Sequence, residues 1–256
     1  GTTLFELPLF SWSMLIAGSI WILALPIWLS NLAISWVDFL GADALRYGAV
    51  ENIWHQLSWL WSQPMIFAFA IPVLGIAGDI IPVSSGVSQR QYRIQQIAIG
   101  AMGALSFGAF AQPFFNPDVA NQAVFVVMGI LVLIPVLVFM GGLADTSIRG
   151  NLSFSAHLVL SVVGMLALLV AAAASAFHVS GPAIGAIQEI NDSWLDGLIT
   201  WLRDVHGTVM ATAVMEHALI ASVIGVVAGL YYWSPKIFGH QLNRNAGALS
   251  AITLLG

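Results

Sequence analysis

Long apolar stretches separated by short polar loops make up most of this sequence. A membrane-spanning helix needs about 20 mostly apolar residues, and six stretches reach that length. They cover roughly residues 9–37, 64–86, 94–114, 121–142, 154–177 and 206–233. A seventh apolar stretch begins near Ala246 and stops at Gly256. The pattern predicts an all-α polytopic membrane protein, with six transmembrane helices and the start of a seventh in a single membrane domain over residues 1–256.

The composition also favours a membrane protein. Of the 256 residues, 59% are hydrophobic and 7% are charged, and the mean hydropathy is +0.91. A soluble domain carries about 25% charged residues. The seven Lys and Arg residues are scattered singly, so they form no phosphate-binding stripe, and we expect no nucleic-acid partner. The absence of Cys excludes disulfides, thiolate metal sites and iron–sulfur clusters.

Charged residues in the loops indicate how the chain is oriented. Loops on one side hold five of the seven basic residues, which are Arg90, Arg93, Arg149, Lys236 and Arg244. Loops on the other side are mainly acidic and rich in tryptophan. Because positively charged loops stay on the cytoplasmic side, we expect a cytoplasmic N-terminus in a bacterial inner (plasma) membrane. On the outer side, residues 191–204 have the spacing of apolar residues typical of a short interfacial helix.

Small residues recur at every fourth position in two of the expected spans. They are Gly100, Ala104 and Gly108 in the third span, and Ala221, Gly225 and Gly229 in the sixth. Small side chains allow helix backbones to approach closely in lipid. We interpret both stripes as helix-packing surfaces.

Glu216 and His217 are ionisable residues that fall near the middle of the sixth expected span. Charge is costly inside a bilayer, so both residues are functional candidates. Three structural roles compete with function: a contact with a partner chain, a place in a water-filled pocket, or a neutral Glu bonded to a backbone carbonyl. The six histidines are scattered, and none pairs with another at the spacing of a helical metal site.

Three segments resemble subunit I of the haem–copper oxidases, the cytochrome c oxidase type. They are LPLFSWSMLIAGSIWILALP, IWHQLSWLWSQPMIFAFAIPVLGIAGDIIP and AGLYYWSPKIFGHQLNRNAGALSAITLLG. The most specific piece is YYWSPKIFG at residues 231–239, which is similar to the family's YYWFPKMFG. The resemblance runs through nearly the whole chain. It implies the family's fifth to tenth spans and the start of the eleventh.

The resemblance also implies that the copper and proton-path positions are replaced. The family's WFFGHPEVY, which contains a copper-binding His and a Tyr joined to it, reads WLWSQPMIF here, so Gln63 and Phe67 stand at those positions. The His-His copper motif is expected near residues 109–116, which read AFAQPFFN. The family's PTGIK segment becomes PVLVF, with Phe139 at the position of the lysine. Copper favours imidazole ligands, so we expect no copper.

The haem ligands of the family come from an AHFH-like stretch on its tenth span. Counting from YYW places them at Ala213 and Met215, whereas counting from His206 places them at Val214 and Glu216. His217 lies one or two residues away under either count. We therefore predict no cofactor for this chain, with haem at His217 as the alternative.

These observations lead to a main hypothesis and three alternatives. The main hypothesis is a degenerate, non-catalytic oxidase subunit that packs within a respiratory electron-transport complex, with other membrane subunits, lipid and quinone as expected partners. The first alternative is a haem-binding chain, and the second is half of a split oxidase that takes part in electron transfer to oxygen. The third is a proton conduit centred on Glu216, although no broken-helix pair is visible.

Overall fold

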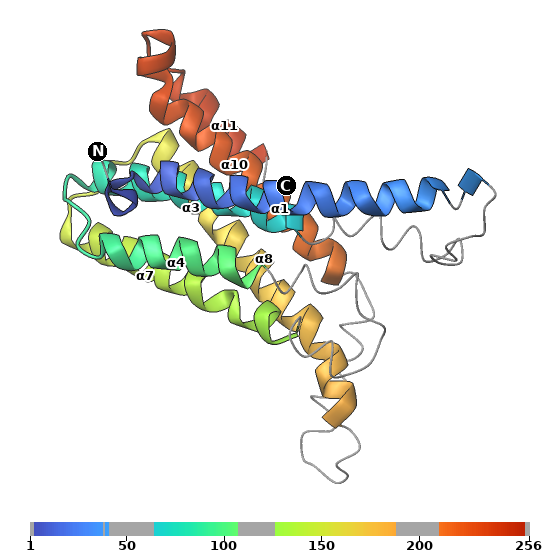
Figure 1. Cartoon of the computed structure of the whole chain (residues 1–256). Coiled ribbons are helices and arrows are strands. Elements are labelled where there is room, and N and C mark those ends of the chain that lie inside the picture. The colour runs from blue at the N-terminus through green and yellow to red at the C-terminus, as the bar shows by residue number, and fades with distance from the viewer. Residues whose placement is uncertain (1–2, 38, 41–63, 107–125, 188–209, 254–256) are drawn as a thin grey trace.

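The computed structural model describes residues 3–37, 39–40, 64–106, 126–187 and 210–253. Within these ranges the regular elements are helices and there is no strand (Figure 1). They are η1 (Leu4–Glu6), α1 (Leu9–Val37), α3 (Pro64–Ser85), α4 (Tyr92–Leu105), α7 (Leu133–Arg149), α8 (Ala156–Ile187), α10 (Met210–Phe238) and α11 (Arg244–Thr253). The expected interfacial helix at 191–204 lies outside the described residues.

Five helical stretches in the described ranges are long and apolar enough to cross a membrane. They are Leu9–Val37, Met65–Ser85, Val126–Arg149, Ala156–Phe177 and Ala213–Phe238. The remaining expected span, 94–114, is described only over α4 and the residue that follows it. The all-α polytopic membrane fold class is confirmed, and the protein is an integral membrane protein.

Helix α7 extends past residue 142, where the sequence pattern ended this span. The polar residues beyond that point are held by bonds within the helix. Thr146 donates from Oγ1 to the Gly142 carbonyl over 2.9 Å, and Ser147 donates from Oγ to the Leu143 carbonyl over 2.9 Å. Arg149 Nε lies 3.1 Å from Asp145 Oδ2, one helical turn away. These local bonds satisfy polar groups that hydropathy alone assigned to a loop.

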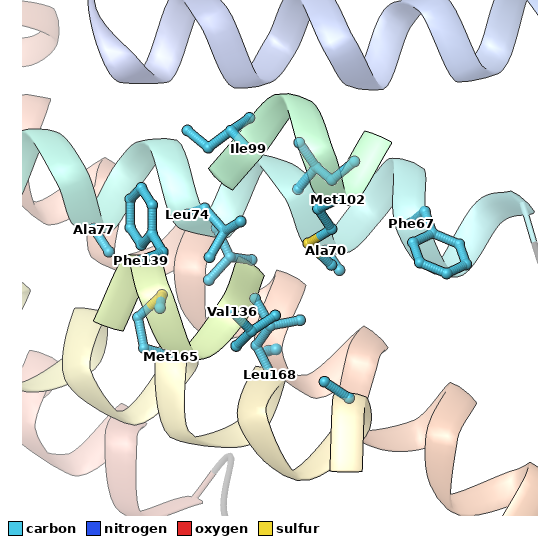
Figure 2. Packing of buried hydrophobic residues seen from close by; sticks show 14 of the residues in the cluster. Phe67, Ala70, Leu74, Ala77, Ile99, Met102, Val136, Phe139, Met165 and Leu168 are labelled. Carbon is cyan, nitrogen blue, oxygen red and sulfur yellow. The ribbon is translucent and has the colours of Figure 1, made fainter. Parts of the chain in front are cut away.

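Helix α3 is the centre of the bundle. It is the most buried of the five spanning stretches, and it contacts α1, α4, α7, α8 and α10. Figure 2 shows its residues facing side chains of three other helices. From α3 come Phe67, Ala70, Leu74 and Ala77, which meet Ile99 and Met102 of α4, Val136 and Phe139 of α7, and Met165 and Leu168 of α8.

The start of α1 is fixed to α4 by polar groups. Tyr92 and Gln96 of α4 both donate to the Leu7 carbonyl, over 2.5 and 3.2 Å, and Trp12 Nε1 donates to the Gln96 carbonyl over 2.9 Å. Burial, together with the carboxyl of Asp79, raises the pKa of the Tyr92 hydroxyl above its ordinary value. The hydroxyl therefore stays protonated and can keep donating this bond.

Helices α1 and α3 cross at two glycines. A Cβ at position 75 would lie 2.7 Å from Phe10 Cα and 2.8 Å from the Leu9 carbonyl oxygen. A Cβ at position 78 would lie 2.5 Å from Leu9 Cδ1. The missing side chains let α3 lie close beside the N-terminal part of α1, whose C-terminal part extends beyond α3 in Figure 1.

Candidate functional site

A small, partly open cavity of about 20 Å³ lies where α3, α4, α8 and α10 meet the residue just before α7, and we call it the pocket. Its described lining is apolar except for the hydroxyl of Ser175. The lining residues are Ile66, Phe67, Ala70, Met102, Val132, Leu168, Ala171, Ala172, Ser175 and Val214. This volume gives room for about one water molecule and is far below the roughly 300 to 1,000 Å³ of small-molecule sites.

Small side chains leave the space for this pocket. Helix α8 contributes Ala171, Ala172 and Ser175, which belong to the run AAAAS at residues 171–175, and α3 contributes Ala70. The sequence interpretation missed this pocket. The alanine run was the available signal, because four alanines in a row on a buried span leave little side chain to fill the space beside them.

The replaced family positions that the structure describes lie in different surroundings. Phe67 lines the pocket, with 8% of its surface exposed. Phe139 does not line it, since this ring is 0% exposed in the core, near Gly78 and Leu74 (Figure 2). Val136 is also completely buried. Gln63 lies outside the described residues, so the structure does not place the residue at the copper-ligand position.

The donor groups of the described lining do not fit copper. Copper sites in proteins are built mainly from imidazole nitrogen and from thiolate or thioether sulfur. The described lining offers one hydroxyl, Ser175, and one thioether, Met102. Across the residues that the structure describes, His, Cys, Asp and Glu form no group of three that could hold a metal ion.

His217 is partly buried on α10, and its Nδ1 lies 2.8 Å from the Ala213 carbonyl oxygen, one turn back along the helix. Because a carbonyl can only accept, Nδ1 donates in this bond, and no residue that the structure describes bonds to Nε2. This is the tautomer that a metal-binding histidine uses when a backbone carbonyl orients it. His217 does not belong to the described lining of the pocket.

Glu216 lies on the exposed side of α10. It is the fourth residue of the spanning stretch Ala213–Phe238, so it lies closer to the N-terminal end of the described span than to its middle. The expected position near the middle came from a longer apolar range, 206–233. Its neighbour His217 points about 100° away around the helix, so the two side chains do not share one face.

The two stripes of small residues differ in the structure. Ala221, Gly225 and Gly229 are all buried, and a Cβ at position 225 would lie 3.0 Å from Val73 Cγ2 of α3. In the other stripe, Ala104 is exposed and Gly108 lies outside the described residues. A Cβ added at Gly100 would lie 3.8 Å from Trp12 Cζ2, an ordinary van der Waals contact.

The close approach of α4 within this chain occurs at Gly103 instead, where an added Cβ would meet Ile16 of α1. Packing through the stripe of Gly100, Ala104 and Gly108 therefore stays a prediction. The sequence pattern counted small residues at a spacing of four, and it could not show which side of the helix meets α1.

Comparison with known proteins matches the whole chain, residues 1–256, to the family described as cytochrome C and Quinol oxidase polypeptide I. Quinol oxidase subunit 1 of Bacillus subtilis (strain 168) is 25% identical over 96% of this chain and 36% of its own length. Cytochrome c oxidase subunit 1 of the same organism is 25% identical over 98% of this chain and 39% of its own length.

A putative cytochrome c oxidase subunit 1-beta of Streptomyces coelicolor is 27% identical, over 99% of this chain and 42% of its own length. The chain spans about two fifths of the length of these relatives. The resemblance to haem–copper oxidase subunit I is confirmed: the chain belongs to the cytochrome c and quinol oxidase polypeptide I family.

Proposed function

We propose that this chain is a non-catalytic, subunit I-like membrane protein with a structural or assembly role in a respiratory electron-transport complex. The observation that carries the proposal is the packing of Phe67, Val136 and Phe139. These residues stand where the resemblance places a tyrosine, a threonine and a lysine of the chemical machinery, and all three are buried among apolar side chains.

The chemistry of these side chains supports a loss of catalysis. A proton path needs groups that can hydrogen-bond water, and neither Val136 nor Phe139 offers one. Phe139 is completely buried in the core, and its ring offers no hydrogen-bonding group to a water there. Phe67 has no hydroxyl to give up a proton or an electron. A scaffold that keeps its helix packing needs none of these groups.

Its setting in the cell follows from the same proposal. The relatives are named as oxidase subunits, so the expected partners are other membrane subunits of a respiratory complex, with lipid and quinone in contact with the apolar surface. The loop charges support a bacterial plasma membrane and a cytoplasmic N-terminus.

The test is the absorption spectrum of the purified chain, oxidised and dithionite-reduced, after expression in haem-replete membranes. We expect no stoichiometric Soret band and no stoichiometric copper by elemental analysis, from a sample that gives a single gel-filtration peak and a helical circular dichroism spectrum. A Soret band or copper at one equivalent per chain would contradict the non-catalytic proposal.

A second candidate is a haem-binding chain, or half of a split oxidase, that takes part in electron transfer to oxygen. The bond between His217 Nδ1 and the Ala213 carbonyl favours it, because this bond orients the imidazole as an axial ligand requires. A partner chain would supply the other axial ligand.

This candidate makes a separate prediction. In membranes that contain the partner, His217→Ala is expected to abolish a haem band assigned to this chain, because it removes the axial nitrogen. Ser222→Ala is the matched control, since it removes only a hydroxyl that bonds to the Ala218 carbonyl of the same helix and leaves the imidazole untouched, and the band should persist. A band that survives His217→Ala would exclude His217 as a ligand.

A further inference from the structure

One face of α10 carries a regular row of exposed side chains. They follow the spacing three, four, three, four along the helix, and we call the row the α10 seam: Glu216, Leu219, Val223, Val226 and Leu230. The four apolar side chains of the seam are between 41% and 55% exposed. This spacing matches the contact positions of helices that pack against each other at a shallow, left-handed angle.

The opposite face of α10 is already used within the chain. Val214, Ala218, Ala221 and Gly225 are buried, and α10 packs on α8 and α3 through this side. A Cβ added at Gly164 of α8 would lie 3.4 Å from the Ala221 carbonyl oxygen. The seam therefore faces away from the helices that hold α10 in place.

A carboxyl group distinguishes the seam from the other exposed helix faces. Away from the Asp145–Arg149 pair at the end of α7, helices α7 and α8 expose apolar side chains that lipid alone can cover. Examples are Ile134 and Leu137 on α7 and Val162 and Leu166 on α8. Glu216 is exposed in a stretch, residues 209–230, whose only ionisable residues are Glu216 and His217. A carboxyl exposed to lipid is costly unless a partner group meets it.

We propose that the α10 seam docks a transmembrane helix of another membrane chain, and that this helix carries a basic side chain at the level of Glu216. The partner must be a helix, since a lone segment in lipid has to satisfy its own backbone groups. A Lys or Arg supplies the positive charge that pairs with the Glu216 carboxylate, and small or branched apolar residues of the partner pack between Leu219 and Leu230. This inference rests on the proposed role as a complex subunit.

The test uses host–guest peptides in phosphatidylcholine vesicles. The probe is a Leu/Ala transmembrane peptide with one Lys at the depth of Glu216, compared with the same peptide carrying Leu there. The chain has no Cys, so His240→Cys at an exposed position gives a unique site for a donor dye, and the acceptor dye is on the peptide. Energy transfer then reports the association.

We expect the Lys peptide to bind the wild-type seam about 3- to 10-fold more tightly than the Leu peptide, the range of polar contacts between membrane helices. Glu216→Gln should remove this preference. Val223→Trp should weaken the binding of both peptides, whereas Val162→Trp on the apolar face of α8 should weaken the binding of neither. Equal binding of the two peptides, or a preference that survives Glu216→Gln, would overturn the proposal.

Native gels of membranes from the source organism separate this inference from the proposed function. If the wild-type chain migrates in a complex and the Glu216→Gln and Val223→Trp variants do not, the result supports both the proposed function and the docking seam. If both variants still migrate in the complex, the structural role of the chain is supported and docking through the α10 seam is contradicted. Energy transfer between labelled copies without peptide, abolished by Val223→Trp, would assign the seam to a second copy and also overturn the proposal.

Discussion

Gly75→Ala is expected to destabilise the chain by about 3 kcal/mol, although it adds only one methyl group. The new Cβ would lie 2.7 Å from Phe10 Cα and 2.8 Å from the Leu9 carbonyl oxygen, and it would also collide with Ser13 Oγ. Two of these atoms belong to the backbone of α1, so no rotamer change can clear them. The helices must move apart, and the packing along their crossing is lost.

Thermal unfolding of the purified chain in detergent measures the effect. A loss of this size lowers the Tm of a chain this long by about 6–12 °C. Gly18→Ala is the matched control, because it lies on α1 with nothing within 4 Å of the added Cβ, and it should leave the Tm unchanged or slightly higher. Equal Tm values for the two variants would show that α1 and α3 do not cross at Gly75.

The sequence predicts the spanning helices well because hydropathy acts locally. A helix must satisfy its backbone bonds inside lipid, so a long apolar run specifies both the secondary structure and its place in the membrane. The same reasoning failed at the end of α7. There, Thr146 and Ser147 bond to carbonyls one turn back, and polar residues continue a helix that composition alone would have ended.

The site depended on information that local patterns do not contain. The pocket forms where Phe67, Met102, Leu168 and Val214 come together from four helices, and their separation in sequence hides that proximity. The family resemblance located Phe67 and Phe139 as replaced positions, but only the structure shows that Phe67 lines a pocket while Phe139 fills the core.

Glu216 illustrates the remaining gap between sequence and structure. Its position in an apolar stretch identified it as a candidate, and three structural roles stayed open. The structure places it on the exposed face of α10, and its contact with a partner chain stays a prediction. Whether a side chain on a helix is exposed depends on which face of the helix its neighbours bury. Hydropathy along the sequence does not identify that face.

Gly225→Leu is the second change with a large expected effect, because position 225 packs against two helices at once. A Cβ there would lie 3.0 Å from Val73 Cγ2 of α3, and the Gly225 nitrogen lies 3.5 Å from where a Cβ on Gly164 of α8 would stand. A leucine adds three further carbon atoms beyond that Cβ. We expect most of the folded chain to be lost, and with it any assembly that depends on α10.

The recovery of monodisperse chain from membranes, followed by native electrophoresis, measures this loss. Gly225→Ala should be much milder, since the Val73 methyl groups can shift by a few tenths of an ångström to admit one carbon. Gly141→Leu on α7 is the control for adding a leucine to a membrane helix, because nothing lies within 4 Å of its Cβ. If Gly225→Leu is recovered as well as Gly141→Leu, then α10 does not pack tightly on α3 and α8. The outward direction of the α10 seam would then lose its support, since the seam is defined by the face that this packing buries.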